Sequence, residues 1–416
     1  MMQVLYNILT HTTKAVLWPS QFFSKKMRFF VEGRKNALLL LQAALKPEDT
    51  TIWFHCASLG EFEQGLPIMQ ALKKAKPGYK LAVTFFSPSG FEIKKNTPLA
   101  DAISYLPYDT PQNVAKFLEI VHPSMAFFVK YDFWPNYLKA LNGRKIPTFL
   151  ISGLFRKEQL FFKKYGSFMR EALSCFDHFF IQNEASKELL ASIGFNNVTV
   201  SGDTRFDRVS HQIEMNNTLD FMEHFKGNAI CIACGSTWPE DEAVLLPYIN
   251  EKSGSNVKFV VAPHSIDVHK IESFRKKLKP SSVQYSESNP EKLKQAQVLI
   301  VDTVGFLSKI YSYADVAYVG GAMGHTGLHN ILEAATFGVP IVIGSNYQKF
   351  PEAIKLEDLA GLYTIQNAKE CMDVMEKFVN DKKFREQTGM IAGHFVNKNT
   401  GATQLVMSFL EKRGLV

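Results

Sequence analysis

The chain has 416 residues, which is too long for one hydrophobic core and suits two domains of ordinary size. Its composition, 46% hydrophobic and 21% charged, is typical of a globular protein and excludes a disordered chain. The formal net charge of +7 is modest and no long basic run or RNA-binding motif occurs, so the sequence argues against a nucleic-acid partner. Five scattered cysteines exclude a disulfide framework and indicate a reducing compartment.

The N-terminal segment, residues 1–35, carries an uneven share of the positive charge. Residues 1–23 are too polar and too short for a membrane span and lack the small-residue cleavage site of a signal peptide. Aromatic and aliphatic side chains occur throughout residues 1–23 and are followed by a group of cations, which predicts a membrane-associated segment lying on an anionic surface. A packed helix with a solvated basic face is the alternative. The cations are Lys14, Lys25, Lys26, Arg28, Arg34 and Lys35, against the single acid Glu32.

From residue 51 onward, short apolar runs alternate with amphipathic stretches. This pattern predicts two series of buried parallel strands and hence two doubly wound domains, residues 36–205 and 206–416, facing a central cleft. The C-terminal helices from Ala368 onward are expected to pack outside the second sheet. The predicted strands are Ile52–Ala57, Leu81–Phe86, Met125–Val129, Thr148–Ile151 and Phe179–Gln182, then Ala229–Cys234, Phe259–Ala262, Val298–Val301, Val316–Val319 and Val339–Ile343.

A C-x-x-C pair, Cys231 and Cys234, falls inside one of these apolar runs. No second pair exists to complete a zinc site. The pattern favours two buried strand residues over a metal or redox centre.

Every chemically suggestive segment follows a predicted strand. Because ligands bind at the carboxyl ends of parallel strands, these segments are expected to converge on one cleft. They are Ser58–Glu61, Lys130–Asp132, Gly235–Thr237, Pro263-His264, Asp302-Thr303 and Gly320–Asn330.

The glycine-rich segment Gly320–Gly327 runs from an apolar strand towards an Asn330–Glu333 pair. Glycines let a backbone approach a ligand closely, and helix N-termini offer N–H groups to phosphate. A carboxylate in that position can accept two ribose hydroxyls, so the pattern predicts a sugar-nucleotide site. Many retaining enzymes of this architecture carry a second glutamate eight residues earlier, where this chain has His325. An inverting enzyme, or one that uses an unusual sugar, is therefore favoured.

Glu61 opens the helix that follows the first strand. Transfer to a sugar hydroxyl needs a base within hydrogen-bonding reach, and a carboxylate can serve. The alternative is a helix N-terminal charge that is favourable to the dipole, a description that also fits Glu63.

Taken together, these segments resemble the 3-deoxy-D-manno-octulosonic acid (Kdo) transferases of lipopolysaccharide assembly, in the family's order from about residue 5 to about residue 400. The resemblance implies a GT-B fold and metal-independent, inverting transfer from CMP-Kdo to the lipid A precursor, with no cofactor. It also implies attachment to the cytoplasmic face of the inner membrane. The matching segments are Trp53–Glu61, Tyr105–Asp109, Phe133–Asn136, Phe176-Asp177, Gln182–Glu184, Gly202–Asp207 and Gly320–Glu333.

Matched position by position, the family's general base falls on Glu61. A basic residue that supports the transition state falls on Arg205, where lysine is more usual. The family's donor-contacting positions fall on Pro263, His264, Val304, Gly305, Phe306, Asn330, Ile331, Leu332 and Glu333.

Three positions depart from the family pattern. Lys130 stands where the family often has a carboxylate, with Asp132 at a second acidic position. Pro263-His264 replaces a Pro-Arg pair, and Val304-Gly-Phe306 replaces Met-Gly-Glu. The resemblance therefore implies a donor pocket of similar shape and altered side-chain chemistry.

Two other functions fit parts of the sequence. A sugar-nucleotide epimerase of the same fold would not need the basic N-terminus. A degenerate binding protein is suggested only by Lys130 and Phe306. His325 and His329 could ligate a metal, but Gly327 between them favours a loop, and no metal site is predicted.

Overall fold

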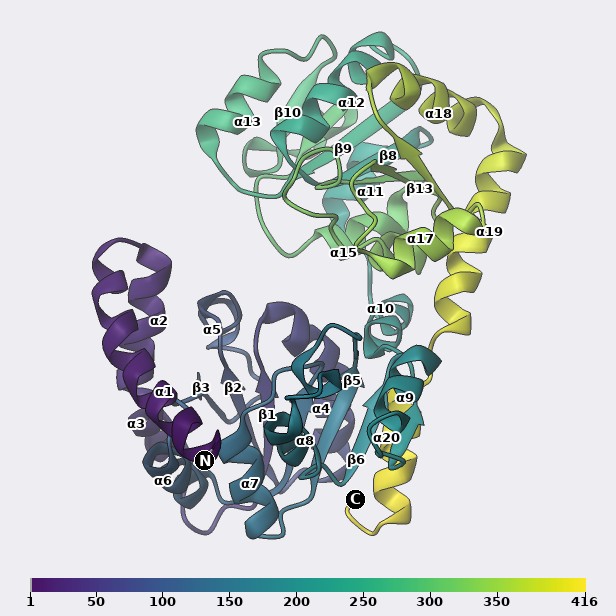
Figure 1. Ribbon diagram of the computed structural model, residues 1–416. Helices are drawn as coiled ribbons and strands as arrows, with labels where there is room; N and C mark the ends of the chain where they lie inside the picture. The colour runs from purple at the N-terminus through teal and green to yellow at the C-terminus, as the bar shows by residue number, and fades with distance from the viewer. Residues whose placement is uncertain (1) are drawn as a thin grey trace. The chain divides into compact units, whose positions relative to one another are not determined.

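The structure, a computed structural model, describes residues 2–416 except for the side chains of Lys14 and Ala15. The chain forms two compact units, Met1–Arg208 with Thr400–Val416, and Val209–Asn399. Each unit contains one parallel sheet of seven strands flanked by helices (Figure 1). The predicted α/β class with two doubly wound sheets is confirmed. The predicted contribution of the Lys14 side chain lies outside the described residues.

The first sheet has the order β3-β2-β1-β4-β5-β6-β7, with every neighbouring pair parallel. The winding direction reverses between β1 and β4, because the chain builds one side outward from β1 and then returns to build the other. Its strands are β1 (Thr51–Cys56), β2 (Lys80–Phe85), β3 (Ala102–Tyr105), β4 (Pro123–Val129), β5 (Thr148–Gly153), β6 (His178–Ile181) and β7 (Val198–Val200).

The helices of the first unit include the N-terminal group and one helix from the C-terminus. They are α1 (Met2–Leu17), η1 (Trp18–Phe22), α2 (Lys25–Lys35), α3 (Ala37–Ala44), α4 (Leu59–Ala75), α5 (Pro88–Lys94), α6 (Pro111–Val121), α7 (Pro135–Gly143), η2 (Leu160–Phe162), α8 (Ser167–Leu173), α9 (Glu184–Ala191) and α20 (Ala402–Lys412). The chain leaves this unit within α10 (Thr204–Glu214).

The second sheet has the order β10-β11-β9-β8-β12-β13-β14 and is also parallel throughout. Its direction reverses between β8 and β12. The strands are β8 (Ile230–Thr237), β9 (Val257–Pro263), β10 (Ser282–Gln284), β11 (Val298–Ile300), β12 (Val316–Val319), β13 (Ile341–Gly344) and β14 (Leu362–Ile365). The helices are α11 (Asp220–Lys226), α12 (Pro239–Glu251), α13 (Val268–Arg275), η3 (Tyr285–Glu287), α14 (Pro290–Gln295), α15 (Leu307–Ile310), η4 (Tyr311–Tyr313), α16 (Leu332–Ala335), α17 (Pro351–Asp358), α18 (Ala368–Asn380) and α19 (Lys382–Lys398).

All ten strands predicted from apolar runs are present, within a few residues of their predicted ends. The four strands that the sequence analysis missed are β3, β7, β10 and β14, which are the outermost strands of the two sheets. Central strands are covered on both faces and so read as continuous apolar runs, whereas edge strands are short and less apolar. Cys231 and Cys234 lie buried in β8, as predicted.

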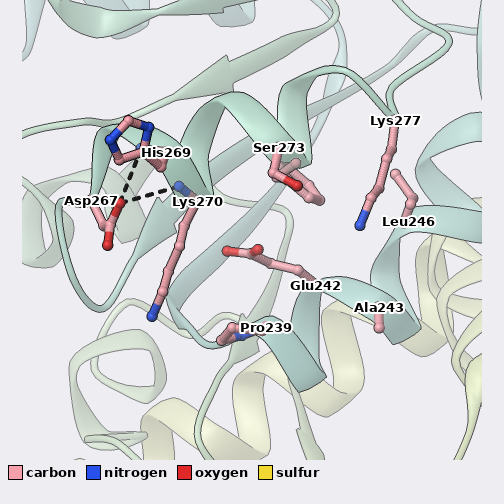
Figure 2. A pocket seen from close by; sticks show the side chains of 10 residues that line it. Pro239, Glu242, Ala243, Leu246, Asp267, His269, Lys270, Ser273 and Lys277 are labelled. Atoms are coloured by element: carbon pink, nitrogen blue, oxygen red, sulfur yellow. Dashed lines mark hydrogen bonds between the residues drawn. The ribbon is translucent and has the colours of Figure 1, made fainter.

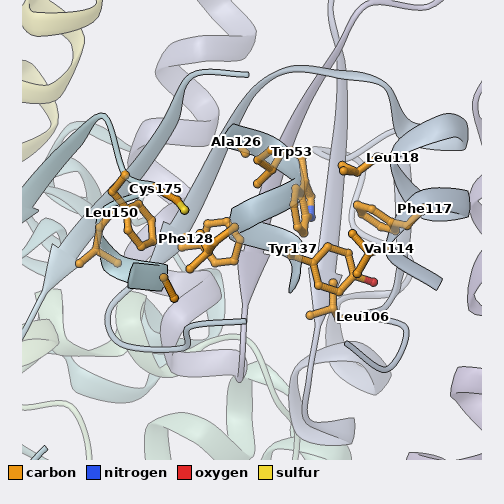
Figure 3. Packing of buried hydrophobic residues seen from close by; sticks show 14 of the residues in the cluster. Trp53, Leu106, Val114, Phe117, Leu118, Ala126, Phe128, Tyr137, Leu150 and Cys175 are labelled. Carbon is orange, nitrogen blue, oxygen red and sulfur yellow. The ribbon is translucent and has the colours of Figure 1, made fainter. Parts of the chain in front are cut away.

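Aromatic rings fill one face of the first sheet, as Figure 3 shows around Trp53. The Trp53 ring lies 4.7 Å from Phe117, 5.3 Å from Phe128 and 5.5 Å from Tyr137, measured between centroids. These tilted and edge-on contacts join β1, β4, α6 and α7. The core thus fixes the relative positions of the strands that carry the site described below.

The C-terminal helix departs from the sequence prediction. Residues 206–416 were expected to form one domain, with the last helices outside the second sheet, but α20 belongs to the first unit. Val406 and Leu410 are buried in the core cluster that contains Phe54 and Phe127. Asp207 accepts hydrogen bonds from the backbone N–H of Thr403 (2.7 Å) and from that of Gly401 (2.5 Å). The apolar face of α20 is buried against the first sheet, which is why this helix belongs to the first unit. The amphipathic pattern of the sequence predicts that one face is buried, but it does not show which sheet covers that face.

The N-terminal helices are part of the first unit, and α3 and α2 contact β3 beside them (Figure 1). The Tyr6 hydroxyl donates to Asp109 (2.7 Å), and Gln3 Nε2 donates to Asn136 (2.7 Å). One face of this segment is therefore packed, as the alternative prediction stated. Within residues 2–416, no helix combines the length and the apolar character needed to cross a bilayer.

The position of α20 predicts a difference between two leucines on that helix. Leu410 is 0% exposed and Leu405 is 48% exposed. Leu410→Ala should lower the free energy of unfolding by about 2–5 kcal/mol, because it leaves a cavity, whereas Leu405→Ala should change it by about 0.5 kcal/mol or less. Hydrogen exchange should then quicken in β1 and β4. Faster exchange confined to β8 and β12 would contradict the assignment of α20 to the first unit.

Candidate functional site

Glu61 lies in the first turn of α4, directly after the central strand β1. It is only 6% exposed, and its Oε2 accepts the Ser58 N–H (3.0 Å). This bond caps the helix, so Glu61 has the helix N-terminal role that the sequence analysis gave as the alternative. That role does not exclude a second one as a base. Burial is the main cause that raises the pKa of Glu61 to about 7, with Asp132 adding to it while His55 and Lys130 oppose it. A carboxyl that titrates near neutral pH is suited to general base work.

Asp132 follows β4, the neighbour of β1 at the point where the sheet reverses. Its Oδ2 accepts from His55 Nε2 (2.7 Å) and from the Trp134 indole N–H (3.1 Å). His55 is fully buried in β1, and its other nitrogen contacts the Thr84 hydroxyl (3.0 Å). The sequence analysis did not single out His55 or Trp134 as site residues, although both lie within the matched segments.

Lys130 comes directly after β4 and has a left-handed backbone, with φ of 70°. This conformation is unusual for a residue with a side chain and marks a sharp exit from the strand. Its ammonium lies 5.3 Å from the centre of the Tyr131 ring. Because Lys130 lowers the pKa of Glu61 while Asp132 raises it, a cation and an anion from one loop act on the same carboxyl in opposite directions.

Arg205 is held by Asp203 in the first turn of α10. Asp203 Oδ2 lies 2.8 Å from Arg205 Nε and 2.8 Å from its NH2 nitrogen. Asp203 also accepts from Gln64 Nε2 (3.1 Å), and Gln64 lies on α4 one turn after Glu61. The Thr204 hydroxyl donates to the Gln64 carbonyl. These contacts tie the Arg205 segment to the helix that carries Glu61.

Glu63 has a structural role, in agreement with the more cautious sequence prediction. Its carboxylate lies 2.8 Å from Lys94 Nζ and 2.7 Å from Arg208 Nε. The pairs join α4 to α5 and α10.

In the second unit, the glycine-rich loop leaves β12 beside the point where that sheet reverses. Gly321 has φ of +97°, and a Cβ atom there would lie 2.1 Å from the Gly327 carbonyl oxygen. The Gly321 N–H donates to Asp241 Oδ2 (2.9 Å), while the Tyr318 hydroxyl donates to Asp241 Oδ1 (2.7 Å). A buried carboxylate on α12 therefore sets the start of the loop.

Asn330 and Glu333 lie together, as predicted, at the start of the short helix α16. Asn330 Nδ2 donates to Glu333 Oε1 (3.2 Å), and Asn330 Oδ1 accepts the Leu332 N–H (3.2 Å). Ile331 and Leu332 point into the core, with at most 1% of their surface exposed. Of the four predicted donor positions in this segment, only Asn330 and Glu333 can present side chains to a ligand.

Pro263 is the last residue of β9 and His264 follows it. His264 belongs to an aromatic cluster that the sequence analysis missed. The Trp238 and His264 rings are stacked at 4.4 Å, and His329 lies 4.5 Å from His264. The Trp238 indole N–H donates to His329 Nε2 (3.2 Å). Burial, with His264 beside it, lowers the pKa of His329 to about 4. His329 is therefore neutral at pH 7, and its Nε2 lone pair is an acceptor for the indole.

The predicted donor segment Val304–Phe306 forms the loop before α15. Val304 is exposed, and Gly305 has φ of +100°. The Phe306 ring packs 5.3 Å from Phe221 and 5.3 Å from Tyr285. The phenylalanine that replaces a family glutamate is thus part of an aromatic cluster.

A cavity of about 410 Å³ lies between α12 and α13 (Figure 2). Glu242 lines it from α12, and Lys270 and Lys277 line it from the side of α13. Burial raises the pKa of the Glu242 carboxyl, while a hydrogen bond from the Thr237 hydroxyl (3.1 Å) opposes the shift. Thr237, which belongs to the Gly235–Thr237 segment expected at the cleft, thus donates its hydroxyl hydrogen bond to the Glu242 carboxylate.

Metal-ligating residues do not gather at either site. Across residues 2–416, no group of three or more His, Cys, Asp or Glu side chains is placed to hold a metal ion. His325 is exposed on the glycine-rich loop, whereas His329 pairs with Trp238.

Known proteins resemble this chain over most of its length. It is 25% identical to a 3-deoxy-D-manno-octulosonic acid transferase of Haemophilus influenzae, over 88% of this chain and 87% of the relative. A transferase of the same name from Aquifex aeolicus is 26% identical, over 85% of this chain and 94% of the relative. The solved structure of UDP-GlcNAc 2-epimerase from Neisseria meningitidis superposes with a TM-score of 0.61 at 16% identity, over 87% of this chain and 100% of that one. At that identity the epimerase shows the fold alone.

The two parallel seven-stranded sheets give the chain a GT-B fold, which structural neighbours among glycosyltransferases and epimerases share. A family model described as 3-deoxy-D-manno-octulosonic-acid transferase (kdotransferase) matches residues 26–208, and the full-length relatives extend the match across the second unit. The chain is therefore similar to the Kdo transferases over both units, and these relatives support a glycosyltransferase activity.

The ionisation of Glu61 predicts a pH dependence of stability. Its pKa rises from 4.5 to about 7 on folding, so between these values the folded protein holds a proton that the unfolded chain releases. This contribution is complete below pH 4.5 and is lost as pH rises through 7. It amounts to roughly 2–3 kcal/mol. Urea unfolding between pH 4.5 and 8 should show that the free energy of unfolding of the wild type falls as pH rises. In Glu61→Gln the free energy of unfolding should depend less on pH.

Asp132→Asn is the matched control, because it removes the like charge and keeps the shape. It should move the decline to lower pH without abolishing it. Identical profiles for wild type and Glu61→Gln would show that Glu61 has an ordinary pKa.

Proposed function

We propose that this protein transfers Kdo from CMP-Kdo to a hydroxyl of the lipid A precursor, with inversion and without a metal ion. The observation that carries the proposal is the buried Glu61 with a pKa near 7, in a chain similar to the Kdo transferases. Glu61 is the proposed general base and the first unit the acceptor-binding unit. The second unit is the proposed donor-binding unit.

In the proposed step, the Glu61 carboxylate takes the proton of the acceptor hydroxyl. The hydroxyl oxygen forms a bond to the anomeric carbon of Kdo, and the bond between that carbon and the CMP phosphate oxygen breaks. CMP leaves with the electron pair, so one bond forms and one breaks on opposite faces of the sugar. His55 and Asp132 are given no proton transfer in this step: His55 holds Asp132 by a hydrogen bond, and Asp132 adds to the burial that raises the pKa of Glu61.

Negative charge develops on the phosphate of CMP as it departs, and a cation must balance it. We assign this role to Arg205, whose guanidinium is oriented by Asp203, and we give Lys130 a supporting role beside Glu61. In the family pattern, Arg205 stands where a lysine is more usual, and Lys130 stands where a carboxylate is often found.

For the donor, we assign the ribose hydroxyls to Glu333, with Asn330 fixing its carboxylate. The loop Gly320–Gly327 allows close backbone approach to the phosphate. The stacked rings of Trp238 and His264 offer a face to the cytosine base. Pro263, Val304, Gly305 and Phe306, with the backbone of Ile331 and Leu332, complete the proposed donor contacts.

Attachment to an anionic membrane surface is the third part of the proposal. The face of α1 and η1 that is not packed exposes large apolar side chains, followed by the cations of α2. This combination supports an interfacial segment that lies on the cytoplasmic leaflet. The exposed side chains are Val4, Leu5, Ile8, Leu9, Val16, Trp18, Phe22 and Phe23.

Glu61→Gln should lower the turnover of Kdo transfer about 100-fold or more, because it removes the base and keeps the shape. The product is measured by mass spectrometry after incubation with CMP-Kdo and lipid A precursor, in the presence of excess chelator. Glu63→Gln is the control and should retain near-normal turnover, since its carboxylate only joins helices. Equal turnover of wild type and Glu61→Gln would remove Glu61 from the mechanism, and sensitivity to the chelator would refute metal independence.

The affinity for CMP should distinguish the proposed base from the proposed ribose contact. Glu61→Gln should bind CMP as the wild type does, whereas Glu333→Ala should bind it about 10–100-fold more weakly, because a charge-assisted hydrogen bond is lost. Calorimetry with CMP measures both. Unchanged affinity in Glu333→Ala would make the ribose assignment wrong.

Membrane binding is tested on exposed side chains, because α1 is packed and its deletion would disturb the first unit. Phe22 and Phe23 are 70% and 88% exposed. The double change to serine should weaken sedimentation with anionic vesicles about tenfold or more, and high salt should partly release the wild type. The control is Tyr165→Ser, an aromatic residue of 71% exposure outside this segment. Equal binding by the double variant and the wild type would contradict the interfacial role.

A further inference from the structure

A cavity of about 380 Å³ opens in the first unit between the N-terminal helices and the start of α6. None of its lining residues belongs to the proposed donor or acceptor site. Its walls carry three basic side chains, Arg34, Lys35 and His11, and no aspartate or glutamate. The cavity therefore has the charge of an anion site.

Arg34 is a buried cation with incomplete pairing. It is 7% exposed, and it donates to the carbonyl oxygens of Phe30 (3.0 Å) and Phe86 (2.7 Å). Its guanidinium carbon lies 3.7 Å from the Phe30 ring centre and 5.3 Å from that of Tyr105. Among the described side chains, no carboxylate forms an ion pair with Arg34, and its Nε has no hydrogen-bond partner. A buried charge without a counterion is costly, and an anion in the adjoining cavity would offset that cost.

The N-terminus of α6 opens on the same cavity, which is lined there by Thr110, Gln112 and Asn113. This helix has eleven residues, begins with Pro111 and is capped by the Thr110 side chain. The first turn of such a helix favours negative charge. Asp109, which precedes Thr110 in the chain, does not line the cavity: its buried carboxylate accepts from Tyr6 and from two backbone N–H groups.

The remaining wall is apolar and comes from Trp18, Val31 and Leu38. The Trp18 ring lies 5.4 Å from the ring of Phe22, which is exposed. A free inorganic anion would use only the basic part of this cavity. A ligand with an anionic head and a hydrocarbon body would use both parts.

We propose that this cavity binds a membrane glycerophospholipid, with its phosphate between Arg34, Lys35 and the N-terminus of α6 and its first acyl carbons against Trp18, Val31 and Leu38. The inference deepens the proposed membrane attachment, on which it rests, by giving the surface a defined lipid site. It does not depend on the transferase reaction.

The test uses the full-length protein and dihexanoyl-phosphatidylglycerol below its critical micelle concentration, with binding measured by calorimetry. The lipid should bind in a 1:1 ratio and at least about tenfold more tightly than inorganic phosphate, because the apolar wall adds to the phosphate contacts. Equal affinity for inorganic phosphate would identify a free-phosphate site and overturn the lipid assignment. Since neither a bilayer nor CMP-Kdo is present, loss of transfer or of vesicle binding in other variants leaves this result unaffected.

Three surface variants separate this site from general electrostatic attraction. Lys35→Gln should weaken lipid binding about fivefold, whereas Lys26→Gln, the same change on the same helix outside the cavity, should leave it unchanged. Gln112→Glu places a negative charge where the phosphate would lie and should weaken binding about tenfold or more, while a negative charge in a first helical turn preserves the helix. Equal affinities of the Lys35 and Lys26 variants, or wild-type affinity in Gln112→Glu, would overturn the proposal.

Discussion

Reversal of the winding direction within each sheet is the constraint on which the rest of this molecule depends. Two adjacent parallel strands whose connections run to opposite sides leave a gap at their carboxyl ends that no crossover helix covers. In the first sheet these strands are β1 and β4, and in the second they are β8 and β12. Glu61 and Asp132 follow the first pair, and Trp238 and the glycine-rich loop follow the second. The chemistry is therefore placed by the order of strands.

Burial then gives these polar residues their properties. Glu61 caps α4 and is enclosed by the first unit, so the loss of solvation raises its pKa, and Asp132 raises it further. The capping bond from the Ser58 N–H opposes this shift, so burial and Asp132, and not the cap, make the pKa of Glu61 suitable for a base. In the second unit, burial has the opposite effect on the basic residue His329 and keeps it neutral. Desolvation always favours the uncharged form, which is the acid of a carboxyl and the base of an imidazole.

The N-terminal segment shows how one stretch of chain can serve both stability and a surface. Tyr6 and Gln3 bind buried polar groups of the first unit, while large apolar side chains of the same helices remain exposed. The packed face agrees with the prediction of a packed helix, and the exposed apolar face is the one on which the proposed interfacial role rests. An amphipathic pattern with a period of 3.6 residues permits this, because each face meets a different environment.

The sequence by itself determined the central strands, the two-sheet organisation and the residue types that carry chemistry. Strands that are covered on both faces must be continuously apolar, and the backbone at Gly321 has no room for a side chain. Both requirements are visible in the local sequence. The edge strands β3, β7, β10 and β14 leave no such mark, because one of their sides has no neighbouring strand. Only the tertiary structure decided that α20 returns to the first unit, that His55 and Trp134 hold Asp132, that Trp238 stacks on His264, and that Arg34 lies buried beside a cavity without a carboxylate. Each of these contacts joins residues whose partners are fixed by packing across the fold, and periodicity along the chain carries no information about such partners.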